Sequence, residues 1–235
     1  SGRERVVLAC AGIALAIHFA SWIASLEYTS VAISTLLVGT TPIWTAAYDA
    51  VVYRHAPPRA ALAAFVAGAI GLAMIVSYDR TPAPHPGAEM LGDSLALVGA
   101  AAIGAYLLLV RTVRARLGTR SIVTQTYSWA AAALVFAALC ARQSPPPLSA
   151  TAAWGGILAM ALVSQLLGHT AINASLRWFS PSAVAFATLL EPVFAAALAL
   201  AIFGEAIPPL GLAGGLIVLG AIAVVLWTDP KRELA

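Results

Sequence analysis

Charged side chains are scarce in this sequence. Only 10% of its 235 residues are Asp, Glu, Lys or Arg, whereas about a quarter are charged in a typical soluble domain. Hydrophobic residues make up 61% of the chain, against about 45–50% in soluble domains. The composition therefore argues against an ordinary soluble domain and favours a protein whose surface faces lipid.

Lysine and cysteine are also nearly absent. Lys231 is the single lysine, and the sequence pI is about 9.1. The basic residues are therefore almost all arginine. In a membrane protein such arginines gather at one membrane face, so we expect no nucleic-acid partner. Cys10 and Cys140 both lie in apolar runs without a CxxC pair, so neither a disulfide framework nor a metal site is expected.

Motifs for catalysis are missing as well. The sequence contains no GxSxG, no HExxH and no nucleotide-binding P-loop. We therefore predict that the protein is not an enzyme and needs no cofactor.

Long apolar runs are abundant. A membrane-spanning helix needs about 20 consecutive apolar residues, and eight runs approach that length. They are 6–25, 31–53, 60–78, 92–111, 121–141, 152–173, 181–203 and 209–228. The sequence thus predicts an all-α integral membrane protein with eight visible transmembrane helices.

Two stretches of the chain resemble each other at a constant offset of 150 residues. Residues 24–47 and 174–197 are identical at several matched positions, which in the first stretch include Ala24, Ser25, Leu26, Ser30 and Pro42. Pro58 and Pro208 continue the same register. Such an internal repeat predicts two related structural halves. The halves differ chemically, because Glu191 stands where the first half has Thr41.

The two halves are unequal in length. The last three runs match the first three, whereas 92–111 and 121–141 would map to positions before residue 1. We therefore expect two further helices upstream, giving ten in all. The domains are predicted as a first repeat at 1–78, an external linker at 79–91 and a second repeat at 92–235.

Basic residues divide unevenly between alternate links. Eleven of the 13 fall in one set of links, whereas only Arg80 and Arg142 fall in the other. Since cytoplasmic links carry the excess of Lys and Arg, we place the first set and the C-terminus in the cytoplasm. With five helices per repeat, the two halves must be inverted, as is typical of secondary transporters.

A family resemblance rests on these residues. Both stretches follow an A-x-L-x-[Y/W]-x-S pattern with a later Pro, and the second continues as Leu190-Glu-Pro-Val-Phe-Ala-Ala196 and Phe203-Gly-Glu205. The chain resembles the paired EamA-type domains of the drug/metabolite transporter superfamily. The first half departs from that pattern, with Arg54-His55 where the second has Gly204-Glu205.

The resemblance implies ten helices, cytoplasmic termini, and export or exchange of small metabolites such as amino acids across a bacterial inner membrane. In some family members the tenth helix makes dimer contacts. A homodimer through the glycine-rich run 209–228 therefore remains an open expectation.

Glu191 and Pro192 lie in the middle of an apolar run. An ionisable side chain inside a span is costly and is a functional candidate by default. Glu191 either binds a proton or a cationic substrate group, or it is a hydrogen-bonded structural latch. Pro192, like Pro42 in the first half, is expected to kink its helix.

Other candidates for substrate binding are polar or aromatic residues inside the runs. Gln165, His169 and Asn173 follow at steps of four, so they share one face of a helix. The alternative role for such residues is hydrogen bonding between helices. The remaining candidates are His18, Trp22, Thr41, Trp44, Tyr48 and Tyr106.

Three functions follow from these observations. The first is a secondary transporter with alternating access, a small-molecule substrate and a lipid surround. The second is a membrane-embedded acid-base enzyme that uses Glu191, His18 and His169 on a lipid-soluble substrate. The third is a non-transporting membrane scaffold. The inverted repeat favours the first function, because an enzyme does not need such pseudo-symmetry.

Overall fold

Helices account for all regular structure in the described part of this computed structural model, which covers residues 2–52, 54, 59–77, 84–142, 144–204 and 206–229. The helices are α1 (Gly2–Ser25), α2 (Val31–Val38), α3 (Thr41–Val52), α4 (Arg59–Val76), α5 (Glu89–Arg114), α6 (Thr119–Cys140), α7 (Thr151–Ala159), the π-helix η1 (Met160–His169), α8 (Thr170–Ser175), α9 (Pro181–Ala187), α10 (Leu190–Phe203) and α11 (Pro209–Trp227). His55, Pro58, Arg80, Glu205, Lys231 and Arg232, which entered the repeat and charge arguments, lie outside the described residues.

These helices form eight segments that are long and apolar enough to cross a membrane, because α2–α3, α7–η1–α8 and α9–α10 each make one span. The predicted all-α membrane protein with eight visible spans is thereby confirmed. Large apolar side chains cover the outer surface. On α6, for example, Val135, Phe136 and Leu139 are 59%, 69% and 70% exposed, as expected of side chains that contact lipid.

Two of the predicted spans are interrupted. The run 31–53 breaks at Gly39–Thr40, and the run 181–203 breaks at Thr188–Leu189. Each break lies shortly before a proline, Pro42 or Pro192, which cannot donate a helical hydrogen bond. In the first half, the hydroxyl of Thr41 instead donates to the carbonyl oxygen of Val38 at 2.7 Å. The prolines thus lie in the first turn of α3 and of α10, where they are well tolerated.

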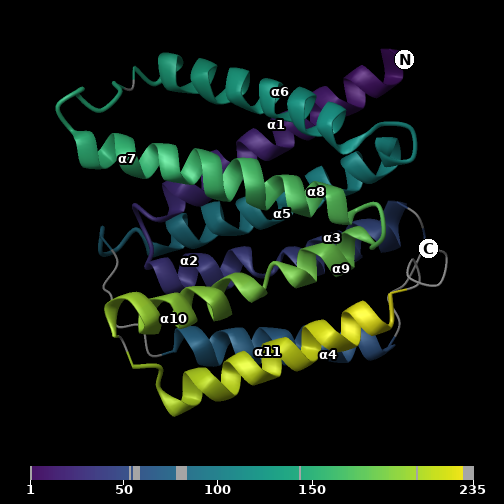
Figure 1. Cartoon of the computed structure of the whole chain (residues 1–235), viewed down its shortest axis with the longest axis vertical. Coiled ribbons are helices and arrows are strands. Elements are labelled where there is room, and N and C mark those ends of the chain that lie inside the picture. The colour runs from purple at the N-terminus through teal and green to yellow at the C-terminus, as the bar shows by residue number, and fades with distance from the viewer. Residues whose placement is uncertain are drawn as a thin grey trace.

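Two helix groups hold the molecule together (Figure 1). In the first, α5 packs along α1 and also contacts α2 and α3, while α6 covers the other side of α1. In the second, α4 and α11 lie side by side, with α9 against α11. Each group has its own buried apolar cluster, and Phe186 and Leu189 beside the second break belong to the second cluster.

The helices α4 and α11 contact each other through matching positions. Every buried residue of α4 has a buried residue of α11 at an offset of 150. Gly71 and Gly214 form the closest approach, because a Cβ atom built on Gly71 would lie 2.7 Å from the carbonyl oxygen of Gly214. Small residues at such a contact let helix backbones meet directly. The face of α11 that carries Gly214 is thus occupied by α4.

The turns that start the two broken spans also match. Ser30 accepts a hydrogen bond from the amide of Ile33 at 3.2 Å, and Ser180 accepts one from the amide of Ala183 at 3.1 Å. Both serines are N-caps with extended backbone, which satisfies one amide of the first helical turn. The recurring Ser30 and Ser180 of the sequence repeat therefore have the same local function.

The links separate into two ends of the bundle. At one end, Arg116 lies 3.8 Å from Glu4, Arg111 lies 2.8 Å from Asp49, and the Ser180 amide bonds to Asp229. We call this the basic end, because it holds Arg111, Arg114, Arg116 and Arg177. At the opposite end, the ring of His85 lies beside Tyr28 and bonds to the carbonyl of Glu27. This alternation is the one that the arginine pattern predicted.

Candidate functional site

A cavity of about 340 Å³ lies among α1, α5, η1 and the two helix breaks. Ligand pockets commonly range from about 300 to 1,000 Å³, so a small metabolite fits. The lining residues come from both halves of the sequence. They are His18, Phe19, Trp22, Val38, Thr41, Ile103, Leu107, Met160, Ser164, Gln165, Gly168, His169, Ile172, Thr188 and Glu191.

Ten of these lining residues form five pairs at the offset of 150. The pairs are His18 with Gly168, Phe19 with His169, Trp22 with Ile172, Val38 with Thr188, and Thr41 with Glu191. The two halves thus present equivalent positions to one shared space. Their side chains differ in most pairs, so the cavity is matched in position but not in chemistry.

The π-helix η1 supplies a wall of this cavity. Its hydrogen bonds run from i to i+5, so its turns are wider than those of an α-helix. Ser164 and Gln165 line the cavity, as do Gly168 and His169 one turn later. Such helices are rare and occur often at functional sites. Of the face predicted at steps of four, Gln165 and His169 line the cavity, whereas Asn173 in the following α8 does not.

Several polar atoms around the cavity lack a protein partner among the described residues. They are the indole nitrogen of Trp22, the amide oxygen of Gln165 and Nδ1 of His169. Buried polar atoms are nearly always hydrogen-bonded, and exceptions call for an explanation. All three atoms belong to cavity residues, so a polar ligand or water in this space would satisfy them.

His18 is held in a defined orientation. Its Nδ1 lies 2.9 Å from the carbonyl oxygen of Gly99 on α5. Since a carbonyl only accepts, Nδ1 carries a hydrogen, and Nε2 is the acceptor whenever the ring is neutral. The ring also stacks on Trp22, with centroids 5.7 Å apart. His18 can therefore offer a hydrogen-bond acceptor beside an aromatic face.

Glu191 lies at the start of α10, where it lines this cavity and two adjoining pockets. No hydrogen bond or ion pair of its carboxyl group occurs within the part of the chain that the structure describes. The backbone amide of Glu191 donates to the carbonyl of Thr188 at 2.9 Å. The carboxyl group is thus positioned by the helix break and is open to the cavity.

Four of the predicted site residues lie elsewhere. Tyr106 is fully buried and donates a 2.8 Å hydrogen bond to Oδ1 of Asn173, which joins α5 to α8. The hydroxyl of Tyr48 lies 3.3 Å from the carbonyl of Ala101, and the Cβ of Trp44 packs near Gly104. These contacts are those of residues that hold helices together. His18, Trp22, Thr41, Gln165, His169 and Glu191 are the candidates that the structure brings together.

Some lining residues were not among the sequence candidates. Thr188 lies at the second helix break, and Ser164 precedes Gln165 on η1. Phe19 contacts the rings of both histidines, with centroid distances of 5.0 Å to His18 and 5.3 Å to His169. The repeat contained a usable signal for Phe19, because it stands 150 residues before His169. For Ser164 we find no such signal.

The chemistry of the site suits a polar organic ligand better than a metal ion. Within the described ranges, no group of three or more His, Cys, Asp or Glu residues could hold a metal. The cavity instead combines donors and acceptors of hydrogen bonds with apolar walls from Ile103, Leu107 and Ile172. This mixture is usual for small-molecule sites.

Comparisons with known proteins agree with this architecture. The model of the EamA-like transporter family matches residues 90–227, more than half of the chain. Among 27 solved chains that match, one described as "Crystal structure of protein" has a TM-score of 0.72 and 14% identity. That match covers 98% of this chain and 88% of the other, and at such identity it shows the fold alone. A search of curated proteins found no match.

Proposed function

The chain belongs to the EamA-like transporter family, and we propose that it is a secondary transporter that exports small metabolites such as amino acids by alternating access. We place it in a bacterial inner membrane, with the basic end and the C-terminus in the cytoplasm. The observation that carries the proposal is the cavity whose walls come from matched positions of the two halves. Secondary transporters bind substrate at such an interface between repeats.

The directions of the matched segments support inversion. The helix α1 begins at the basic end, where Glu4 lies near Arg116. Its counterpart in the second half, α7–η1–α8, instead finishes at that end, where Arg177 follows α8. Two equivalent segments that run in opposite directions give the geometry in which one half can rock against the other around a fixed site.

The unpartnered atoms suggest what the substrate carries. The carboxyl group of Glu191 and the amide oxygen of Gln165 can accept hydrogen bonds from an ammonium group. The indole N–H of Trp22 can donate to a carboxylate. Phe19 and Leu107 provide an apolar wall for a side chain. We therefore favour an amino acid or a related amine with an apolar part.

Coupling is proposed to involve Glu191, which is the acidic residue among the described residues that line the cavity. A carboxyl group at this position can bind either a proton or the ammonium group of the substrate. Competition between the two would link substrate release to proton entry. Exchange of one metabolite for another is the alternative coupling, and the proton gradient distinguishes them.

The test is counterflow in vesicles containing the purified protein. Vesicles loaded with unlabelled amino acid should accumulate labelled amino acid without chemical change. A toxicity screen of metabolites in overexpressing cells would first identify the substrate. Accumulation that follows an imposed proton gradient would support proton coupling, whereas trans-stimulation alone would support exchange.

Trp22→Phe provides a specific variant, because it removes the indole N–H and keeps an aromatic ring. We expect its apparent affinity to fall about three- to tenfold, as for one lost hydrogen bond. Trp129→Phe is the matched control, since Trp129 is half exposed on α6 and does not line the cavity. Absence of counterflow for every metabolite tested would contradict the proposal, and product formation would support the acid-base enzyme instead.

A further inference from the structure

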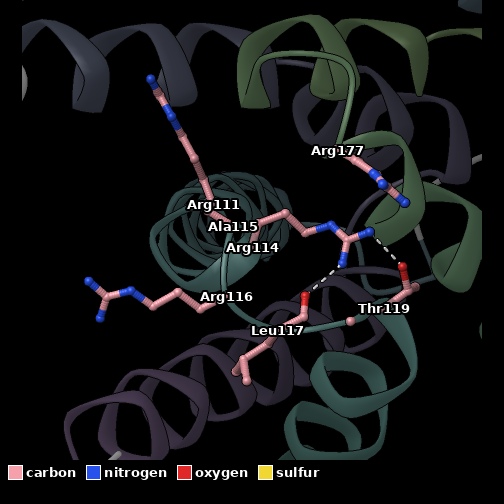
Figure 2. A pocket seen from close by; sticks show the side chains of 8 residues that line it. Arg111, Arg114, Ala115, Arg116, Leu117, Thr119 and Arg177 are labelled. Carbon is pink, nitrogen blue, oxygen red and sulfur yellow. Dashed lines mark hydrogen bonds between the residues drawn. The ribbon is translucent and has the colours of Figure 1, made fainter. Parts of the chain in front are cut away.

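A second cavity of about 580 Å³ lies at the basic end and shares no lining residue with the first. Four arginines are among its lining residues. Arg111 and Arg114 come from the end of α5, Arg116 from the following turn and Arg177 from the turn after α8 (Figure 2). Among the residues that the structure describes, none that lines this cavity is acidic. The side chains of Arg114 and Arg177, from two segments that are distant in the sequence, extend toward the same side, whereas those of Arg111 and Arg116 point away from them (Figure 2).

Nearby carboxylates balance only part of this charge. Arg111 bonds to Asp49 at 2.8 Å, and Arg116 lies 3.8 Å from Glu4. Arg114 donates to neutral acceptors, the carbonyl of Leu117 at 3.0 Å and the hydroxyl of Thr119 at 2.6 Å (Figure 2). Within the described ranges, neither Arg114 nor Arg177 has a carboxylate partner.

The first turn of α6 adds further donors. Gly118, its N-cap, has no side chain that could cap the first amides, and both Gly118 and Thr119 line the cavity. The N-terminus of a helix attracts anions through its free amides and its dipole. Because Arg114 donates to the Thr119 hydroxyl oxygen, that hydroxyl keeps its own hydrogen for another acceptor. Amides, a hydroxyl and guanidinium groups together suit a tetrahedral oxyanion.

We propose that this cavity binds the phosphate of an anionic phospholipid headgroup. The cavity lies at the ends of membrane-spanning helices, where headgroups are located. Trp178 is 48% exposed, and the guanidinium carbon of Arg177 is 5.7 Å from its ring centre. Tryptophan is enriched at the membrane interface, and basic pockets between helices bind lipid headgroups. The site does not depend on the proposed transport activity.

Lipid retention tests the proposal directly. Purified protein is placed in nanodiscs of phosphatidylcholine that contain a minority of phosphatidylglycerol, and bound lipid is measured by native mass spectrometry. We expect selective retention of phosphatidylglycerol. Replacing Arg114 and Arg177 by Gln should weaken that retention about thirtyfold, at about 1 kcal/mol per arginine.

Two single variants keep the test specific. Arg177→Gln alone leaves the hydrogen bonds of Arg114 in place, so it should retain the fold and still lose about fivefold in affinity. Arg59→Gln removes one charge from a helix start outside the cavity, and it should bind as the unaltered protein does.

Three outcomes would overturn the proposal. One is equal retention of phosphatidylglycerol by Arg177→Gln, by the double variant and by the unaltered protein. Another is an equal loss of lipid retention in Arg59→Gln, which would mean that the lipid responds only to the net charge of this end. The third is displacement of the lipid by millimolar inorganic phosphate, which would assign the site to a free anion.

Discussion

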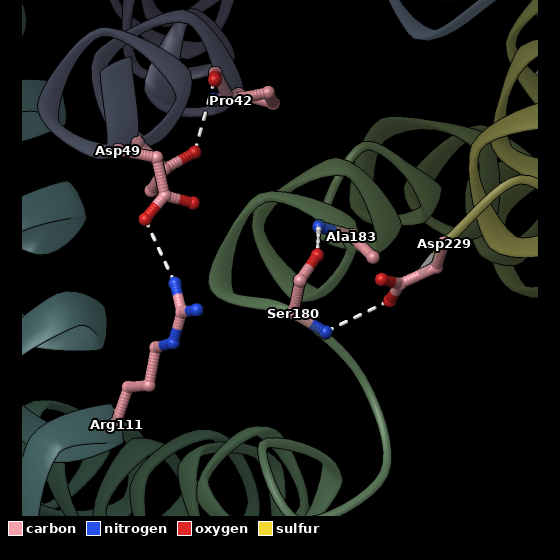
Figure 3. Close-up of polar contacts among 7 residues, drawn as sticks. Pro42, Asp49, Arg111, Ser180, Ala183 and Asp229 are labelled. Atoms are coloured by element: carbon pink, nitrogen blue, oxygen red, sulfur yellow. Dashed lines mark hydrogen bonds and ion pairs between the residues drawn. The ribbon is translucent and has the colours of Figure 1, made fainter. Parts of the chain in front are cut away.

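Asp49 on α3 and Arg111 on α5 form an ion pair at 2.8 Å, at the basic end of the bundle (Figure 3). The same end holds a second link, in which the amide of Ser180 donates to the carboxylate of Asp229 at 2.8 Å. Both contacts join segments that are distant in the sequence. Arg54 is the basic residue nearest to Asp49 along the sequence, whereas the structure pairs Asp49 with Arg111.

The ion pair gives the first prediction. Asp49 and Arg111 are only partly exposed, with side-chain fractions of 16% and 34%, so removing one partner leaves a poorly solvated charge. Asp49→Asn should lower the free energy of unfolding by about 1 kcal/mol and reduce the transport rate. Thermal unfolding in detergent and counterflow measure the two effects.

The exchanged pair Asp49→Arg with Arg111→Asp is the matched control. It keeps both charges and the contact, so it should recover much of the stability lost by either single change. If the exchanged pair is no more stable than the single variants, the contact does not contribute as an ion pair.

The second prediction concerns the position of the acid. Thr41 and Glu191 occupy matched positions in the cavity, so a carboxyl group moved across the repeat should still face the substrate. Glu191→Gln should abolish the pH dependence of transport while the protein remains folded. The double change Thr41→Glu with Glu191→Thr should restore part of it.

Vesicle uptake measured over a range of external pH distinguishes these variants. Thr41→Val, which removes a hydroxyl but no acid, should keep the normal pH profile. Unchanged pH dependence in Glu191→Gln would rule out this role for the residue, because the titrating group would then have to lie elsewhere.

The third prediction tests the contact between α4 and α11. A Cβ atom on Gly214 would lie 2.5 Å from the carbonyl oxygen of Gly71, closer than real Cβ contacts allow. Gly214→Ala must therefore push the helices apart, and we expect a loss of about 1–3 kcal/mol in unfolding free energy. Thermal unfolding followed by tryptophan fluorescence measures the change.

Gly220→Ala is the control on the same helix. A Cβ atom there meets nothing within 4 Å, and alanine is the better helix former by about 1 kcal/mol. The two substitutions should thus change stability in opposite directions. Equal effects would mean that the helices are not in close contact at Gly71 and Gly214.

The fourth prediction separates stability from substrate binding. Tyr106→Phe removes the donor to Oδ1 of Asn173, which leaves a buried acceptor unsatisfied. The cost should be about 1 kcal/mol of stability. Because neither residue lines the cavity, the apparent affinity for substrate should stay within about twofold, a change of under 0.5 kcal/mol. A tenfold loss in counterflow affinity would instead place this pair at the site.

The repeat explains why part of the site was predictable. The offset of 150 residues between matched positions can be read from the sequence alone. It correctly related Pro42 to Pro192 and Thr41 to Glu191. It did not reveal that Trp44 and Tyr48 pack against α5, because the direction of a side chain depends on neighbours from distant segments. Nor did apolar composition distinguish the π-helical turn of η1 from an ordinary α-helix.

The sequence by itself determined that the outer surface faces lipid, where the helical spans lie, and that the links alternate between two ends. These features follow from hydrophobicity, from run length and from the placement of arginines, each of which acts locally along the chain. Only the tertiary structure decided which polar residues share a cavity and which arginines line the second cavity at the basic end. Those outcomes depend on how helices approach and rotate against each other, as Gly71 and Gly214 show, and no local pattern specifies that geometry.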